Sequence, residues 1–168
     1  MSNDNRPDLS QNPDLAGLRY ALSSFATGVT VVTTRDANGQ QHGLTANSFA
    51  SVSLDPPLVL WSISRGTPSF EAFRGCSHYA VNILSSDQEE ISNRFAHASP
   101  DKFAGLEYTL GVGGSPVLAG CIASFECRNE TQHDGGDHVI LVGRVQNFKV
   151  DMGTPLLFFA SRYASLLP

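Results

Sequence analysis

Apolar residues along this chain fall in short runs that alternate with polar positions or are rich in β-branched side chains, as strands require. The first run covers residues 28–34, and Asp36-Ala37-Asn38-Gly39 after it predicts a hairpin turn because Asn-Gly tolerates positive φ. A returning strand is expected over residues 43–53, with Asp55-Pro56-Pro57 ending it. Further strands are predicted over residues 58–64, 76–84, 121–133 and 138–150, the last two joined by Asp134-Gly135-Gly136-Asp137.

Other segments have the features of short helices. Residues 15–25 place apolar side chains at helical spacing. Residues 67–74 open with a Thr cap and with Pro at the first helical position. Residues 85–97 have a Ser or Asp cap, acids in the first turn and a basic last turn, which complements the helix dipole. The glycine-rich stretch 105–114 is expected to be a loop.

This order of elements favours a mainly β fold. About six antiparallel strands against two or three short peripheral helices suit a small closed barrel with helices at its mouth. The 168 residues, 41% of them hydrophobic, have room for one core. We expect residues 1–14 to form a flexible tail and residues 15–168 to form a single domain.

Composition narrows the classes of partner. The longest apolar runs are far shorter than the ~20 residues of a membrane helix, and the polar residues 1–17 do not resemble a secretion signal, which favours the cytoplasm. A net charge of −5 without a basic cluster argues against nucleic acid. Cys76, Cys121 and Cys127 form no CxxC, which argues against a disulfide framework and a zinc site and favours buried thiols in strands.

Candidate chemistry begins with two strips of small polar residues. Neither GxGxxG nor GxxxxGK[ST] occurs, so a nucleotide site here would lie on strands. The strips offer hydroxyls, an amide and close backbone approach, which suit a flat heteroaromatic ring with edge carbonyls and a phosphate tail; ordinary strand and turn Ser and Thr residues give the same pattern. They consist of Thr45, Asn47, Ser48 and Ser51, and of Ser62, Ser64, Thr67 and Ser69.

Charged and titratable candidates are few. Arg65 and Arg94 have the guanidinium fork that binds phosphate, although Arg94 also suits a solvated helix residue that complements the dipole. His138 lies beside the 134–137 turn, where it could donate to a carboxamide or phosphate, or have no role. The remaining histidines lack metal-ligand spacing, so no metal site is predicted; they are His42, His78, His97 and His133.

The order and spacing of several segments resemble one known family, the short-chain flavin reductases. These are the reductase components of two-component flavin-dependent monooxygenases. The resemblance covers the chain from about Leu18 to Leu166. The segments that carry it are residues 25–34, Gly43-Leu44-Thr45-Ala46-Asn47-Ser48-Phe49, residues 53–59, Arg94-Phe95, Asp101-Lys102-Phe103 and Gly136-Asp137-His138.

The resemblance implies a split β-barrel of Greek-key type, forming a homodimer whose second subunit shares or borders the flavin groove. It assigns the isoalloxazine ring and ribityl chain to one set of residues, the phosphate or nucleotide side to another, and nicotinamide binding to a third. The ring set is Gly43, Leu44, Thr45, Ala46, Asn47, Ser48, Ser62, Ile63 and Ser64. The phosphate set is Thr67, Ser69, Arg94 and Phe95, and the nicotinamide set is Gly136, Asp137 and His138, with Tyr163 closing the pocket.

The implied activity is reduction of FMN or FAD by NADH or NADPH, with reduced flavin leaving for a partner monooxygenase. Positioning would supply most of the acceleration, so His138 is expected to orient the nicotinamide and not to take a proton. Backbone N–H groups near Asn47 would stabilise negative charge at the N1–C2 edge of the flavin. Two alternatives stay open: a flavin-binding electron-transfer or storage protein without nicotinamide turnover, and a related barrel enzyme for a pyridoxal-type or other phosphate cofactor, for which the chain lacks extra basic residues.

Overall fold

A computed structural model describes residues 14–166 of the chain. The predicted tail over residues 1–13 lies outside the described residues, and Asp14 is the N-cap of the first helix. The helices are α1 (Leu15–Ser23), α2 (Phe70–Gly75), α3 (Glu89–Ala96) and the 3-10 turn η1 (Val112–Gly114). The strands are β1 (Thr27–Gly28), β2 (Thr30–Arg35), β3 (Gln41–Ala46), β4 (Ala50–Leu54), β5 (Pro57–Ser64), β6 (His78–Ile83), β7 (Tyr108–Leu110), β8 (Pro116–Leu118), β9 (Ala123–Gly135), β10 (His138–Val150), β11 (Leu157–Phe159) and β12 (Arg162–Ala164).

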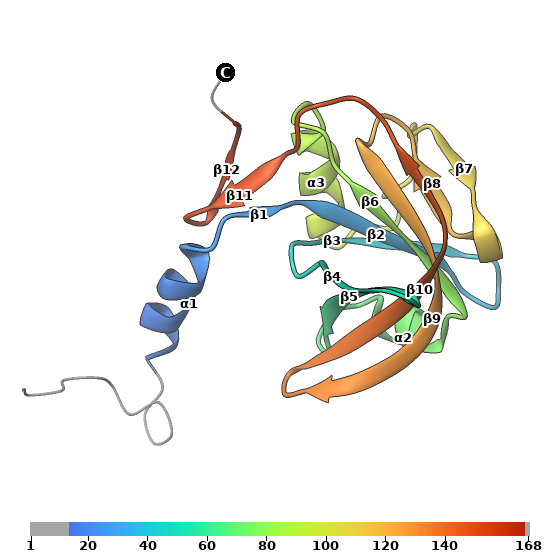
Figure 1. The fold of residues 1–168 in the computed structure, drawn as a ribbon, viewed down its shortest axis with the longest axis horizontal. Coiled ribbons are helices and arrows are strands. Elements are labelled where there is room, and N and C mark those ends of the chain that lie inside the picture. The colour runs from blue at the N-terminus through green and yellow to red at the C-terminus, as the bar shows by residue number, and fades with distance from the viewer. Residues whose placement is uncertain (1–13, 167–168) are drawn as a thin grey trace, which may run out of the picture.

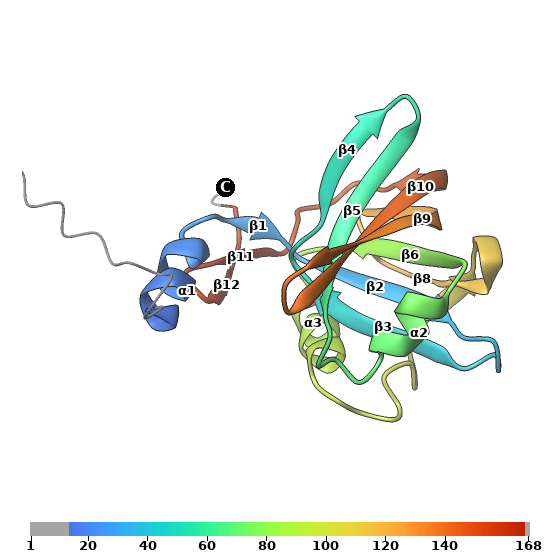
Figure 2. The same ribbon diagram turned by 90° about the horizontal axis from the view of Figure 1, so that it is seen from below.

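The mainly β class with few helices is confirmed, whereas the closed six-stranded barrel is wrong. The main sheet has seven antiparallel strands in the order β3-β2-β6-β9-β10-β5-β4 and does not close on itself (Figure 1). The predicted strand 43–53 is two strands, because the chain leaves the ladder at residues 47–49. β3 then pairs with β2 at one edge, and β4 pairs with β5 at the other. Figure 2 shows the β4–β5 pair standing away from β2 and β3.

Two hydrophobic clusters cover both faces of β2, which explains its run of β-branched residues. Val32 belongs to the cluster around Trp61, whose ring packs edge-on against Phe73 and Tyr79 at 5.0 and 5.8 Å between ring centroids. Val31 belongs to a second cluster that contains Phe95 of α3. Successive side chains of a strand point to opposite faces, so β2 is buried on both sides.

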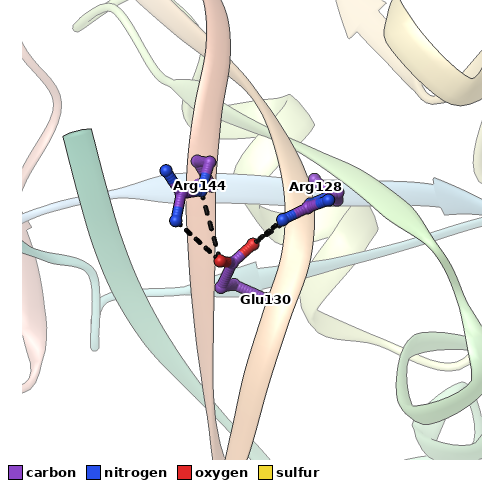
Figure 3. Close-up of polar contacts among 3 residues, drawn as sticks. All are labelled: Arg128, Glu130 and Arg144. Atoms are coloured by element: carbon purple, nitrogen blue, oxygen red, sulfur yellow. Dashed lines mark hydrogen bonds and ion pairs between the residues drawn. The ribbon is translucent and has the colours of Figure 1, made fainter. Parts of the chain in front are cut away.

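β9 and β10 are central strands of the main sheet and form a long hairpin. The predicted Gly136-Asp137-His138 segment lies at the tip of this hairpin. A β-bulge interrupts its register between Val142 and Gly143, and Arg144 faces Arg128 across the ladder beyond it. Glu130 lies between these two guanidinium groups, with Oε2 2.5 Å from Nη2 of Arg128 and Oε1 2.8 Å from Nη2 of Arg144 (Figure 3). The carboxylate therefore separates two like charges at the bulge.

The expected helix starts and one expected loop differ from the structure. α2 begins after Ser69, since Thr67 and Pro68 form a turn in which the N–H of Phe70 donates to the Thr67 carbonyl. α3 begins after Gln88, because the Ser85 hydroxyl donates to the Gly120 carbonyl and to Asp87 instead of capping the helix. The stretch 105–114 holds β7 and η1 in addition to loop, since β7 pairs with β8.

The N-terminal and C-terminal segments form a separate layer beside the main sheet. β1, β11 and β12 make a three-stranded sheet that the sequence did not predict, and α1 extends from it away from the body (Figure 1). The Asp14 carboxylate accepts from the N–H of Gly17 at 2.8 Å, which caps α1. None of the helices between residues 14 and 166 is long and apolar enough to cross a membrane.

Candidate functional site

The tip of the β9–β10 hairpin holds a histidine in a defined orientation. Gly136 has φ of +73°, the left-handed conformation that glycine adopts without steric cost, and it turns the chain into β10. Nδ1 of His138 lies 2.7 Å from Oδ1 of Asp137, and this hydrogen bond is the largest cause that lowers the pKa of Asp137. Because a carboxylate only accepts, Nδ1 donates and Nε2 is left for another group. The side chain of His138 is 43% exposed, so a ligand can reach it.

A second feature is the seam where the two edges of the sheet approach each other. Asn47, Ser48 and Phe49 belong to neither β3 nor β4, so their backbone N–H groups lie outside both ladders. The Ser48 hydroxyl accepts from the N–H of Ser62 at 2.9 Å and donates to the Ser62 carbonyl at 3.2 Å. Ile63 is 1% exposed and pairs with Val139 in the β10–β5 ladder, so it belongs to the core. The seam is thus a polar strip of backbone and short hydroxyls.

A cavity of about 400 Å³ lies beside β3 and the start of α2. It collects half a dozen of the predicted residues from three distant parts of the sequence. Its lining contains three cationic or titratable basic side chains and no carboxylate. The predicted lining residues are Gly43, Leu44, Thr45, Thr67, Ser69 and Phe95, and the unpredicted ones include His42, His97, Lys102 and Phe103.

Lys102 is a cavity residue to which the sequence analysis assigned no role. Its Nζ donates to the carbonyls of Gly43 at 3.1 Å and of Phe95 at 3.0 Å, and burial lowers the pKa of this ammonium. The signal was present in Asp101-Lys102-Phe103, but only the fold shows that this loop returns onto β3. An ammonium has three donors, so Lys102 keeps one for an anionic ligand.

Gly43 has a packing role as well as a place in the cavity wall. A Cβ built there would lie 2.5 Å from Cε1 of Phe95 and 3.3 Å from Cζ of Phe103. The absent side chain allows the Phe95 ring, 1% exposed, to lie directly against β3. Thr45 adds a second link between these elements, because its hydroxyl donates to the Ser92 carbonyl at 2.6 Å.

Two of the predicted residues lie elsewhere. Nη1 of Arg94 donates to the Ala104 carbonyl at 2.8 Å, so this guanidinium holds the loop after α3 and does not line the cavity. The Tyr163 hydroxyl lies 2.8 Å from Oγ of Ser92 and 3.1 Å from Oδ1 of Asn93, which ties β12 to α3. Tyr163 is therefore fixed at α3, and its side-chain hydrogen bonds within residues 14–166 do not reach the hairpin tip.

One turn connects the hairpin tip to the cavity. Ser64 pairs with His138 at the end of the β10–β5 ladder, and the N–H of Thr67 donates to the Ser64 carbonyl at 3.0 Å. Thr67 and Ser69 then reach the cavity wall. The oriented imidazole, the polar strip and the cavity are therefore connected through the end of β5 and the turn that follows it.

The thiols do not offer a nucleophile for this region. Burial raises the pKa of Cys121 and of Cys127 to about 12. The thiolate is the reactive form of cysteine, so neither side chain is reactive near neutral pH. The arrangement suits binding and orientation of a nucleotide-like ligand rather than covalent catalysis.

Comparison with known proteins gives consistent matches. The family model of the flavin reductase like domain matches residues 22–167. The reductase component of a flavin-dependent trigonelline monooxygenase from Acinetobacter baylyi is 48% identical over 131 residues, covering 78% of this chain and 42% of that protein. The NADH-dependent FMN reductase SmoA from Agrobacterium fabrum is 46% identical over 140 residues, covering 83% of this chain and 79% of that protein.

A solved structure gives the same match in three dimensions. The NADH:FAD oxidoreductase SgcE6 of Streptomyces globisporus, in complex with NAD and FAD fragments, superposes with a TM-score of 0.87 at 36% identity, covering 92% of this chain and 94% of that chain. Two curated relatives are much longer, and the chain spans 44% and 42% of their lengths. On the extent of these matches, the chain belongs to the family of the flavin reductase like domain.

Proposed function

We propose that the chain catalyses the reduction of FMN or FAD by NADH or NADPH and delivers reduced flavin to a flavin-dependent monooxygenase. The observation that carries this proposal is the continuity of the site. One turn joins the oriented His138 to a cavity lined by Lys102 and two histidines, and the polar seam is hydrogen-bonded to Ser62 of the strand that leads into this turn. Family membership and the names of the relatives support the same reaction.

The residues of the seam and cavity fit a flavin. The backbone N–H groups at residues 47–49, outside the ladders, suit the carbonyl edge of an isoalloxazine ring. The Thr67 and Ser69 hydroxyls and the Lys102 ammonium suit the phosphate end. Lys102 takes the place of Arg94 in this assignment, because Lys102 lines the cavity and Arg94 does not. Ser62 and Ser64, partly exposed on either side of the buried Ile63, would line the same groove.

In this mechanism the protein binds and orients. A bound flavin supplies the chemistry of accepting a hydride from the nicotinamide ring. His138 presents Nε2 to the nicotinamide carboxamide, and Asp137 holds the Nδ1–H that fixes the imidazole. Backbone N–H groups near Asn47 stabilise the negative charge that gathers at the facing edge of the ring. No side chain needs to transfer a proton, so positioning accounts for most of the acceleration.

A homodimer in the cytoplasm is part of the proposal. No residue of α1 is buried. Its Tyr20 and Leu22 are 77% and 65% exposed, and Phe25 beyond its end is 79% exposed. Large exposed apolar side chains gathered on one short helix and just beyond it favour an association site. A second copy would cover it and border the flavin groove, as the family resemblance implies.

The deciding experiment follows NADH or NADPH absorbance while FMN or FAD is in excess. We expect loss of the nicotinamide band with at least one pair, and His138→Ala should lower kcat/KM for the nicotinamide about tenfold, the effect of one hydrogen bond. His133→Ala is the matched control, since His133 is exposed on the same hairpin and contacts only Thr131. An unchanged nicotinamide band with every pair would contradict the proposal.

The second candidate function is a flavin carrier without nicotinamide turnover. The free Nε2 of His138 and its pairing with Asp137 favour the reductase. A protein that retains flavin through gel filtration and leaves NADH and NADPH unchanged would be the carrier.

A further inference from the structure

Arg65 lies at the junction between the core and the hairpin tip, on the turn that follows β5. We propose that it is a positioning residue that fixes the tip and thereby the orientation of His138 toward the nicotinamide. This inference rests on the proposed function and goes beyond it, because neither the family resemblance nor the comparisons assign a role to Arg65.

Three contacts attach Arg65 to the tip. Its backbone N–H donates to the Asp137 carbonyl at 3.0 Å, and its Nε donates to the Gly136 carbonyl at 3.3 Å. Its Nη2 forms an ion pair with the carboxylate of Asp134. Arg65 thus contacts three of the four residues 134–137 at the hairpin tip.

The other side of the same guanidinium is attached to the core. It lies over the ring of Phe70, 5.9 Å from the ring centroid, and Phe70 packs against the cluster around Trp61. The cation–π contact and the tip contacts use different parts of a planar group, which suits arginine better than lysine. Arg65 therefore links a rigid cluster to an exposed turn.

The tip needs such a link because little else holds it. Residues 131–137 are exposed, and the ladder between β10 and β5 ends at the pair of His138 with Ser64. Asp137, which orients the imidazole through its carboxylate, lies beyond the end of that ladder. If the tip moved, the Asp137–His138 pair would move with it.

The alternative role for Arg65, a phosphate ligand, makes a different prediction. In the structure its charge faces Asp134, and two of its donors are taken by the tip. A phosphate ligand would be needed for flavin affinity, whereas a positioning residue is needed for use of the nicotinamide. Measuring flavin affinity and kcat/KM for the nicotinamide in the same Arg65 variant therefore distinguishes a phosphate ligand from a positioning residue.

The test uses the full chain with Arg65→Met, Arg65→Lys and the control Arg74→Met. Arg74 forms a comparable exposed ion pair with Glu71, and its side chain makes no contact with the tip. Hydrogen exchange at residues 134–138 reports the tether without any turnover. Stopped-flow reduction of FMN or FAD by NADH reports the rate of hydride transfer, and a flavin titration reports flavin affinity.

We expect Arg65→Met to speed exchange at the tip and to lower kcat/KM for the nicotinamide about tenfold, since small misplacements of a positioned group are costly in rate. Flavin affinity should stay within about twofold, Arg65→Lys should be intermediate, and Arg74→Met should match the wild type. Asp134→Asn alters only one exposed contact, so it should lower kcat/KM for the nicotinamide about twofold. This variant decides the question if Arg65→Met does not fold.

Unchanged exchange at the tip, unchanged nicotinamide kinetics, or an equal loss of flavin affinity would each overturn the positioning role. If the wild type fails to oxidise any nicotinamide, the proposed function is wrong, and the exchange result still shows whether the tether exists.

Discussion

Gly43 shows that a residue assigned to a binding site can also be required for packing. The family resemblance places Gly43 beside the flavin, and the structure puts it in the cavity wall. The same glycine also makes room for the buried Phe95 ring, which the sequence does not reveal. Arg94 is the opposite case, because its residue type suggested phosphate and its neighbour Ala104 determines its actual contact.

Gly43→Ala should lower the free energy of unfolding by about 1–3 kcal/mol, since overpacking a tight site costs this much. The new Cβ would lie 2.5 Å from an aromatic carbon of Phe95, and that ring is packed against Phe103 at 5.0 Å between centroids. Urea denaturation measures the change. Gly28→Ala is the control, because nothing lies within 4 Å of its Cβ position. Equal stabilities of the two variants would show that Phe95 can move aside.

Among the elements, the β9–β10 hairpin has the largest effect on the site, because it carries His138 to the end of β5. Its register depends on the bulge at Val142 and Gly143 and on Glu130 between Arg128 and Arg144 (Figure 3). The hydrogen bonds from Arg144 and then from Arg128 lower the pKa of Glu130 to about 2. The sequence pattern does not single out Glu130, Arg128 or Arg144. Strand register brings these three side chains into contact.

Glu130→Gln tests this cluster through its pH dependence. A carboxyl whose folded pKa is lowered stabilises the protein fully above its ordinary value of 4.5, and the contribution is lost as pH falls toward 2. The variant should therefore melt below the wild type at pH 7, and the two melting temperatures should converge as pH falls from 4.5 toward 3. Glu71→Gln, at an exposed ion pair on α2, should show almost no difference at either pH. A gap that is constant with pH would argue against the ion-pair explanation.

At the scale of the whole molecule, the layer formed by α1, β1, β11 and β12 stands beside the main sheet (Figure 1). Leu22 of α1 and Phe25 just beyond it are 65% and 79% exposed. The N–H of Ala160 donates to the Ser23 carbonyl at 2.9 Å, which attaches α1 to this layer. The core of the chain does not use α1, so the apolar residues at its spacing are explained best by a second copy.

A double substitution of Leu22→Glu and Phe25→Glu should shift the protein from dimer to monomer, because each charge would be buried at the proposed interface. Light scattering after gel filtration measures the mass. Leu110→Glu is the control, since Leu110 is 54% exposed on β7, away from α1 (Figure 1). A wild type that is monomeric at micromolar concentration would refute the homodimer.

The sequence by itself determined the local structure wherever one segment's own pattern sufficed. Alternating and β-branched runs predicted β2, β5, β6, β9 and β10. Helical spacing predicted α1, and capping residues and terminal charges predicted α2 and α3, because these signals are properties of a single segment. The ordered segments around residues 43–49 and 136–138 also identified the family and its two substrates. The predicted starts of α2 and α3 were too early, because Thr67 and Ser85 form other hydrogen bonds instead of capping these helices.

The tertiary structure alone decided which segments meet. Six strand patterns do not say that residues 43–53 break at the seam and send β3 and β4 to opposite edges, because pairing depends on partners far away in the chain. For the same reason Lys102 joins the cavity wall, Arg94 lies outside it, and the Arg65 guanidinium pairs with Asp134 of the hairpin tip. Side-chain chemistry limits what each residue can bind, and the fold determines which of those partners is within reach.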